Sequence, residues 1–457
     1  MTRHVKLLRQ GAIIAILGLM LGQPSDVRCD DWPQWRGPRR DGVWRETGIV
    51  ECLPESLEPR WRTPIGGGFA GPAVVGQRVY VSDRVLPPGV SNPESRWNRT
   101  DPVEGSERVL CLDADTGRLL WKHEYRCRYT ISYPAGPRAT PTVDEGLVYS
   151  LGAMGSLLCL DAVSGRVLWT RDYRRDFGMT MNMWGMAAAP LIDGEKLIVL
   201  AGGANGACVV ALNKRTGKEM WRALESEDPG YSAPIIITWS GVRQLIVWNP
   251  LGVYALNPEN GQQYWSQSFE TRMGHSIATP VFDDATGSLL VSSFFNGSLM
   301  MRLDRLHPKA TLLWKGSSDS ELPQSSDGLH SLMSTPVIDG GHVYGVCSYG
   351  QLRCLDAATG RRIWETRAPT GDGRWWNAFL VRHEQRYFIC NEQGELILAE
   401  LSPEGYSELS RVHLIEPTNT AGRRKIVWSH PAFANRCIYT RNDQQILCVD
   451  LSSHRTP

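Results

Sequence analysis

Short apolar stretches separated by glycine-containing turns recur along most of the chain. In residues 139–169, one stretch follows Pro141, a turn falls at Glu145-Gly146, and a second stretch follows it. A third stretch contains Leu158-Cys159-Leu160, and a fourth ends in Trp169. Short apolar runs bounded by such turns are typical of β-strands. The pattern predicts four short strands in this unit.

The turn before the last strand has nearly the same sequence in most units. It reads Asp-Ala-Asp-Thr-Gly at residues 113–117 and Asp-Ala-Val-Ser-Gly at residues 161–165. Glycine supplies the positive φ that a tight hairpin needs, and the Asp side chain accepts hydrogen bonds from backbone N–H groups further along the turn. We therefore expect a hairpin between the third and fourth strands of each unit.

The unit repeats at intervals of 44 to 52 residues, and most copies end in tryptophan. The copies end at Trp121, Trp169, Trp221, Trp265, Trp364 and, with a one-residue insertion, Trp314. Candidate first strands begin at Pro72, Pro141, Pro190, Pro234, Pro280, Pro336 and Pro431, and an eighth without proline spans residues 377–381. Four strands in a repeat of this length are typical of a propeller blade. The sequence predicts an all-β fold, a single eight-bladed β-propeller of four-stranded antiparallel blades.

The two ends of the repeat indicate how the ring closes. The last unit, residues 426–450, provides three strands, whereas residues 59–64 form an unassigned strand that carries Trp61. Because open sheet edges are unfavourable, we expect Trp61 to complete the last blade as its N-terminal closing strand. The fourth strand of blade seven, residues 407–414, has no tryptophan, and we expect weaker docking there.

The N-terminus has the features of an export signal. Four basic side chains precede residues 11–22, an uncharged apolar stretch too short to cross a bilayer. We expect cleavage after Cys29, with a retained anchor or a lipid attachment as alternatives. The domain boundaries that follow are a signal peptide at 1–29, an N-terminal extension at 30–56 and the propeller at 57–457. The protein is then expected to be periplasmic or secreted, without a stable membrane span.

Charge and cysteine content change this picture little. The 49 Lys and Arg residues nearly balance 48 Asp and Glu residues, so a basic surface for nucleic acid is not expected. Four of the 11 cysteines, Cys111, Cys159, Cys354 and Cys448, occupy the same place in different units. Equivalent positions in separate blades lie far apart, so these four are expected to be small buried hydrophobic residues. The sequence does not indicate which other cysteines pair.

The repeated Ala-x-[Thr/Ser]-Gly-x-x-x-Trp units resemble the tryptophan-docking repeats of the pyrroloquinoline quinone (PQQ) propeller superfamily. The opening Trp32-Pro33-Gln34-Trp35-Arg36-Gly37-Pro38, followed by Asp41-Gly42, is similar to the start of secreted bacterial PQQ-like propeller proteins. The resemblance implies one of two kinds of protein. Quinoprotein alcohol and sugar dehydrogenases bind PQQ and calcium on the propeller axis, whereas non-catalytic members, including the scaffold lipoprotein of the outer-membrane barrel assembly machinery, lack the cofactor.

The residues that such dehydrogenases use are not evident in the sequence. There is no adjacent Cys-Cys pair, no Cys-x-x-Cys-His haem motif and no calcium loop, and the segments before the first strands hold few carboxylates. We therefore predict no catalytic residue, no metal and no cofactor. A PQQ-dependent dehydrogenase with calcium in the axial channel is the alternative.

One set of residues attracts attention because it precedes the predicted first strands and would surround one mouth of the axial channel. These residues are Phe69, Arg138, Trp184, Tyr231, His275, His330, Arg374, Trp375, Trp376, Trp428 and His430. Aromatic rings that stack and basic groups that orient a polar ligand would make this rim a binding site. The other interpretation, which we favour for these side chains, is that they plug the channel.

These observations together predict an exported, non-catalytic propeller that binds a protein or a small ligand through one face. The expected partner is an envelope or extracellular protein, and the expected state is a monomer. Function is expected in the irregular rim and loops, because the regular repeat positions hold the ring together.

Overall fold

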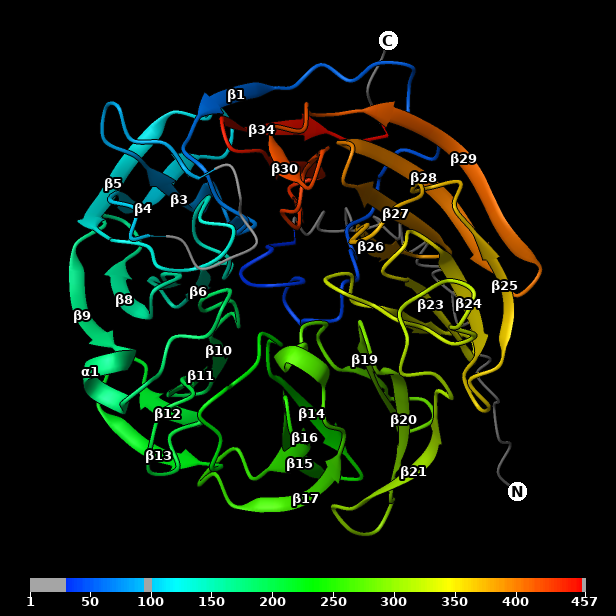
Figure 1. Cartoon of the computed structure of the whole chain (residues 1–457). Helices are drawn as coiled ribbons and strands as arrows, with labels where there is room; N and C mark the ends of the chain where they lie inside the picture. The colour runs from blue at the N-terminus through cyan, green and yellow to red at the C-terminus, as the bar shows by residue number, and fades with distance from the viewer. Residues whose placement is uncertain (1–29, 94–100, 454–457) are drawn as a thin grey trace, which may run out of the picture.

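The computed structural model describes residues 30–93 and 101–453. Within these residues, eight four-stranded antiparallel sheets surround a central axis, and a two-stranded hairpin lies between the last two (Figure 1). The prediction of an eight-bladed β-propeller is confirmed. The predicted signal peptide, including its cleavage position, lies outside the described residues.

The blades follow one another along the chain, each with its first strand nearest the axis. Blade one contains β2 (Ala73–Val75), β3 (Arg78–Val85), β4 (Ser106–Asp113) and β5 (Leu119–Arg126). Blade two contains β6 (Thr142–Asp144), β7 (Leu147–Leu151), β8 (Ser156–Asp161) and β9 (Val167–Asp172), followed by the short helix α1 (Tyr173–Phe177). Blade three contains β10 (Leu191–Asp193), β11 (Lys196–Leu200), β12 (Val209–Asn213) and β13 (Glu219–Ala223). Blade four contains β14 (Ile235–Trp239), β15 (Val242–Asn249), β16 (Gly252–Leu256) and β17 (Gln263–Ser268).

The second half of the ring repeats this order. The 3-10 turn η1 (Arg272–Gly274) leads into blade five, which contains β18 (Val281–Asp283), β19 (Ser288–Ser293), β20 (Gly297–Leu303) and β21 (Ala310–Lys315). Blade six contains β22 (Val337–Asp339), β23 (His342–Val346), β24 (Leu352–Asp356) and β25 (Arg362–Thr366). Blade seven contains β26 (Ala378–His383), β27 (Arg386–Asn391), β28 (Glu395–Ser402) and β29 (Gly405–His413), and the hairpin β30 (Asn419–Ala421) and β31 (Arg424–Ile426) follows. Blade eight contains β32 (Ala432–Ala434), β33 (Cys437–Arg441), β34 (Gln445–Asp450) and β1 (Trp61–Pro64).

Strand β1 closes the ring as predicted. It pairs antiparallel with β34 from Trp61 opposite Cys448 to Pro64 opposite Gln445. The N-terminal strand therefore completes the blade formed by the C-terminal residues, and the pairing of β1 with β34 joins the two ends of the chain. Seven of the eight first strands in the described residues begin directly after the prolines identified in the sequence.

The repeated turn before each outer strand has the expected geometry. In blade one, Asp113 Oδ1 accepts hydrogen bonds from the backbone N–H groups of Asp115 and Thr116, and Gly117 has a φ of 71°. The third strand carries Cys111 opposite Trp121 on the outer strand, and the register shifts immediately afterwards. The same pairing and shift recur at Cys159 opposite Trp169. The short turn and the shift together set where each outer tryptophan points.

The outer tryptophans join neighbouring blades. Trp121 donates a hydrogen bond from Nε1 to the carbonyl of Ala162 in blade two at 3.0 Å. Its ring covers Gly165, where a Cβ atom would lie 2.5 Å from the tryptophan Cε3. Hydrogen bonds of 2.8 to 3.3 Å to the next blade are also made by Trp61, Trp169, Trp221, Trp314 and Trp364. Glycine in the turn therefore both permits the backbone conformation and leaves space for the indole ring.

Two junctions depart from this rule. Trp265 donates instead to Gln244 Oε1 within its own blade, at 2.8 Å. In blade seven, Ser410 faces Leu398 just before the register shift and so stands where other blades carry tryptophan. Its hydroxyl accepts a hydrogen bond from the backbone N–H of Leu53 at 2.8 Å. The N-terminal extension thus contacts the one blade without a docking tryptophan among those described.

The N-terminal extension also crosses the axis of the ring. Trp32 pairs with Val74 of blade one, and the backbone N–H of Trp44 donates to Arg382 of blade seven at 2.8 Å. Between them, the guanidinium of Arg40 donates to the carbonyls of Ala189 and Pro234 in blades three and four. The segment runs through the centre of the ring in Figure 1, coloured blue. It therefore ties together blades that are not neighbours.

Two further properties of the described residues bear on the predictions. Cys111, Cys159, Cys354 and Cys448 are free and buried, as the repeat position indicated. In this part of the chain, no helix has the length and apolar character needed to span a bilayer.

Candidate functional site: the axial pocket

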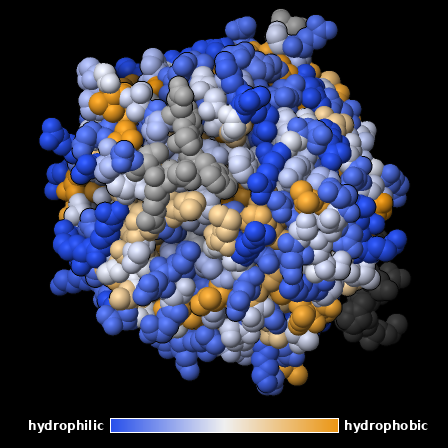
Figure 2. All heavy atoms as spheres, viewed as in Figure 1, coloured by the Kyte–Doolittle hydropathy of each residue, from blue (hydrophilic) through white to orange (hydrophobic). Residues whose placement is uncertain are grey.

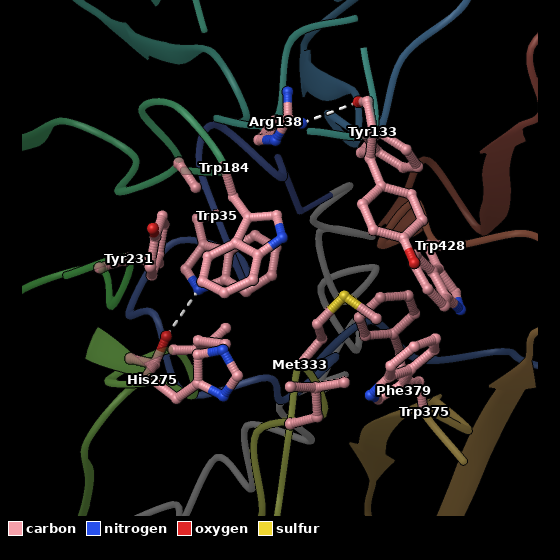
Figure 3. Close-up of a pocket in the computed structure, with 16 residues that line it drawn as sticks. Trp35, Tyr133, Arg138, Trp184, Tyr231, His275, Met333, Trp375, Phe379 and Trp428 are labelled. Atoms are coloured by element: carbon pink, nitrogen blue, oxygen red, sulfur yellow. Dashed lines mark hydrogen bonds between the residues drawn. The ribbon is translucent and has the colours of Figure 1, made fainter. Parts of the chain in front are cut away.

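A pocket of about 190 Å³ opens on the axis of the ring (Figure 3). Its lining residues come from several blades and from the N-terminal extension, and most of them are aromatic or aliphatic. They are Trp35, Phe69, Tyr133, Arg138, Trp184, Ala187, Tyr231, Ala233, His275, Ile277, Thr279, Leu332, Met333, Trp375, Phe379 and Trp428. In the space-filling view, hydrophilic residues cover most of this face and paler to tan atoms lie nearer its centre (Figure 2).

Much of the predicted rim meets at this pocket. Phe69, Arg138, Trp184, Tyr231, His275, Trp375 and Trp428 all line it. They surround an open volume, so they do not plug the channel at this end, contrary to the interpretation favoured from the sequence.

Four predicted rim residues lie elsewhere. His330 is buried with Nδ1 3.2 Å from the carbonyl oxygen of Phe294, and Arg374 forms an ion pair with Glu321 at 2.8 Å. Trp376 is buried beneath the guanidinium of Arg424, which lies 4.7 Å from the ring centre. His430 lies below the pocket, with ring centres 4.9 Å from Trp35 and 4.8 Å from Phe379. These side chains support the pocket or its surroundings and do not line it.

The floor of the pocket is the feature that sequence reasoning missed. Trp35, from the N-terminal extension, donates a hydrogen bond from Nε1 to Thr279 Oγ1 at 2.8 Å (Figure 3), and Trp35 and Phe379 both pack against the buried ring of His430. The motif around Trp35 was visible in the sequence only as a family resemblance. No local pattern places this residue on the axis, because the contact joins segments 244 residues apart.

Two lining residues have unusual backbone conformations. Tyr133 has a φ of 52° and Trp375 a φ of 66°, the left-handed region that non-glycine residues rarely adopt. The backbone N–H of Trp375 donates to the carbonyl of Ser348 at 2.7 Å, and Arg138 donates to the carbonyl of Tyr133 at 2.8 Å. Such conformations cost roughly 1–3 kcal/mol each and persist only where surrounding contacts hold them. The rings of both residues are thus held on the pocket wall before any ligand arrives.

Hydrogen bonds outside the pocket orient its other aromatic rings. The Nε1 of Trp428 donates to the carboxylate of Glu392 at 2.8 Å. Burial raises the pKa of Glu392, although its hydrogen bonds with Arg424 and Trp428 oppose that shift. Trp184 packs edge-on against Tyr231, with ring centres 5.7 Å apart. The wall is therefore a connected set of rings held in place by packing and hydrogen bonds.

The charged and titratable groups of the lining are few. Burial lowers the pKa of His275 to about 4, with a smaller contribution from the charge of Arg374, so this imidazole is neutral near pH 7. Burial also lowers the pKa of Arg138, whose guanidinium donates to the carbonyls of Gly136 and Ser132. No carboxylate is among the lining residues in the described parts of the chain. The pocket is apolar with a positively charged residue on its wall.

Comparison with known proteins assigns this architecture. Residues 105–366 and 296–456 match the family model described as outer membrane protein assembly factor BamB. The chain belongs to this family of PQQ-like propellers. Among curated protein sequences, no relative matches the chain.

Two solved structures share the fold of this BamB-type chain. BamB from Moraxella catarrhalis matches with a TM-score of 0.53 and 14% identity, covering 87% of this chain and 99% of its own. The quinohemoprotein alcohol dehydrogenase from Comamonas testosteroni matches with a TM-score of 0.62 and 14% identity, covering 93% and 81% respectively. At this identity, the two matches establish the propeller fold and leave the function to be argued from the pocket.

The pocket of this BamB-type chain does not suit a calcium-bound quinone. Calcium takes six to eight oxygen ligands, commonly including carboxylates. The polar side chains of the lining include Arg138, which is a donor, and Thr279, whose hydroxyl already accepts from Trp35. Elsewhere in the described residues, no group of three His, Cys, Asp or Glu side chains is placed to hold a metal. The donor set therefore does not fit the metal that would accompany PQQ.

Proposed function

We propose that the protein is an exported, non-catalytic propeller that binds a protein or a small ligand through the face that carries the axial pocket. The observation behind this proposal is a preformed pocket with aromatic walls, one cation and no carboxylate. Such a lining supplies stacking and burial, which are the usual sources of ligand affinity. It offers no carboxylate as a general base next to a cofactor.

The proposal extends to location and partners. The basic and apolar N-terminal residues have the form of an export signal, which supports a periplasmic or secreted protein. Membership of the BamB-type family supports a role as an interaction scaffold with an envelope or extracellular protein as partner. The near-zero net charge supports a protein that acts without nucleic acid, and we propose that it acts as a monomer.

The test compares the protein with two pocket variants. Trp184→Ala and Trp428→Ala remove rings from opposite walls, whereas Leu306→Ala changes a side chain that is 83% exposed on blade five. Ligands are found by calorimetric titration of small aromatic compounds and peptides into the full-length protein. We expect the wall variants to lose affinity at least tenfold and Leu306→Ala to retain it. Equal affinity in all variants would place binding elsewhere.

A second measurement addresses the dehydrogenase alternative. PQQ and calcium are added to the purified protein, and cofactor absorbance and dye reduction with alcohols and sugars are recorded. We expect no tight cofactor uptake and no turnover. Stoichiometric uptake with turnover that Trp184→Ala abolishes would replace the binding function with quinoprotein catalysis.

A further inference from the structure

His275 is a polar side chain that the pocket wall encloses closely. It is 5% exposed, stacks on Phe295 with ring centres 5.2 Å apart, and lies 4.9 Å from the ring centre of Trp184. Its Nδ1 atom is buried and has no hydrogen-bond partner within the described residues. A buried polar atom without a partner is uncommon in native structures and calls for a functional or structural reason.

The enclosed Nδ1 indicates where the imidazole carries its proton. The ring is neutral near pH 7 because burial lowers its pKa to about 4, so only one nitrogen carries hydrogen. Placing that hydrogen on Nδ1 would bury an N–H donor without an acceptor, which is unfavourable. The tautomer protonated on Nε2 instead leaves an unpartnered lone pair on Nδ1, and native structures contain under-satisfied acceptors more often than orphaned N–H groups. Nε2 is not among the enclosed unpartnered atoms, so its N–H is free to meet a partner in the pocket. His275 therefore offers an N–H donor to the pocket, where Figure 3 shows its ring on the wall.

The rest of the lining restricts the charge of a ligand. Arg138 lies on the wall, and Arg374 is close enough to affect the titration of His275. Arg374 is paired with Glu321, whereas no carboxylate among the described lining residues offsets the charge of Arg138 for a bound cation. Aromatic walls often bind quaternary ammonium groups, but the charge balance here opposes them. An uncharged or anionic ligand is favoured.

The volume of the pocket limits the size of the ligand part that it can enclose. About 190 Å³ is below the roughly 300–1,000 Å³ of pockets that hold drug-sized ligands. One aromatic ring with small substituents can stack between Trp184 and the rings on the opposite wall, above Trp35. The enclosed volume thus suits one flat ring, and any larger part of a ligand would lie outside the pocket.

We propose that the axial pocket takes a single aromatic ring that carries an oxygen acceptor and no positive charge, with the oxygen facing Nε2 of His275. This inference rests on the proposed binding function and specifies its ligand class. A phenol-like small molecule and a tyrosine side chain of a partner protein share this chemistry.

The first test uses three probes that share a benzene ring. The full-length protein is titrated calorimetrically with 4-ethylphenol, ethylbenzene and benzyltrimethylammonium. Comparing the three affinities separates the contributions of the oxygen, the ring and a positive charge. We expect 4-ethylphenol to bind most tightly and benzyltrimethylammonium least. The oxygen should contribute about tenfold over ethylbenzene, the effect of one hydrogen bond in an apolar site.

The second test assigns the oxygen preference to His275. In His275→Phe, we expect the affinity for 4-ethylphenol to fall about tenfold and the affinity for ethylbenzene to stay unchanged. The two compounds should then bind equally tightly. His342→Phe, which changes a histidine on β23 outside the pocket, should keep the preference. A preference that survives in His275→Phe, or tighter binding of benzyltrimethylammonium, would overturn the ligand class while leaving axial binding intact.

The third test asks whether the aromatic ring belongs to a small molecule or to a side chain of a partner protein. It also shows whether a negative result contradicts only the ligand class or the proposed binding function as well. N-acetyltyrosinamide binding as tightly as 4-ethylphenol would indicate a protein side chain, whereas binding of 4-ethylphenol alone would indicate a small molecule. Both results support the shared chemistry. If none of the probes binds while other compounds bind in a manner sensitive to Trp184→Ala, only the ligand class fails. If no compound or peptide is sensitive to Trp184→Ala, the binding function fails as well.

Discussion

The circumference of the ring and its axis are built in different ways. At the circumference, one contact recurs from blade to blade: Trp121 on Gly165, Trp169 on Gly217 and Trp314 on Gly360. On the axis, positions that are equivalent in the repeat carry different residues, such as Trp184, His275 and Trp428. Repeated residues are those that every blade needs for stability, whereas a site on the axis needs different groups at different places. The predictions below test this division, beginning with the largest expected effect.

Removing a circumferential tryptophan should destabilise the protein far more than removing an axial one. Trp121→Ala deletes a largely buried ring and its hydrogen bond to blade two, which we expect to cost about 3–5 kcal/mol. Trp184→Ala widens an existing pocket and should cost about 1 kcal/mol or less. Urea unfolding followed by circular dichroism measures both. Similar losses would mean that the axis stabilises the ring as much as the circumference does.

Acid should lower the stability of the protein because histidines are buried near the axis. Burial lowers the pKa of His275 to about 4 and that of His430 to about 3, while unfolding returns them to about 6.5. The unfolded state therefore binds more protons below pH 6.5, and stability falls as pH decreases from 6.5 towards 4. At pH 5 each histidine should contribute a loss of about 2 kcal/mol.

Unfolding measured at pH 7 and pH 5 checks this expectation. His430→Phe should reduce the pH dependence, whereas His342→Phe, at the start of β23 and outside the pocket, serves as the control. If both variants show the same slope as the unchanged protein, His430 does not carry the effect.

Glycine substitutions can separate the docking contact from backbone strain. Gly165 and Gly146 both have positive φ, 71° and 78°, so alanine is strained at either site. A Cβ at Gly165 would lie 2.5 Å from the Trp121 ring, whereas at Gly146 it meets no atom within 4 Å. We expect Gly165→Ala to be less stable than Gly146→Ala by about 2 kcal/mol in urea unfolding. Equal stability would show that the indole moves aside without cost.

The smallest expected effect concerns blade seven, where the N-terminal extension contacts Ser410 at the position that carries tryptophan in other blades. Ser410→Ala removes the acceptor for the N–H of Leu53 and should cost about 1 kcal/mol. Ser407→Ala, on the exposed part of the same strand, should cost nothing measurable. Limited proteolysis of the N-terminal extension, compared between the two variants, provides the measurement. Equal cleavage rates would exclude Ser410 as an anchor of the extension.

The repeat was predictable because its signals are local. The prolines before the first strands, the Asp and Gly of the turns and the terminal tryptophans all act within one blade or its neighbour. Trp61 was recognised as the closing residue because the last unit lacked a fourth strand. Ser410 was recognised only as a missing tryptophan, since nothing in the strand sequence indicated that Leu53 would contact it.

The sequence alone thus determined the blade count, the closing strand and the residues that join the blades. It also identified many of the rim residues that line the pocket, because each precedes a first strand. Tertiary structure decided that the rim surrounds open space, that Trp35 forms its floor, and that His330, Trp376 and His430 are buried away from it. The physical reason is the range of the contacts. Blade contacts join segments close in the chain, whereas the floor depends on Trp35 reaching Thr279 across the axis of a closed ring.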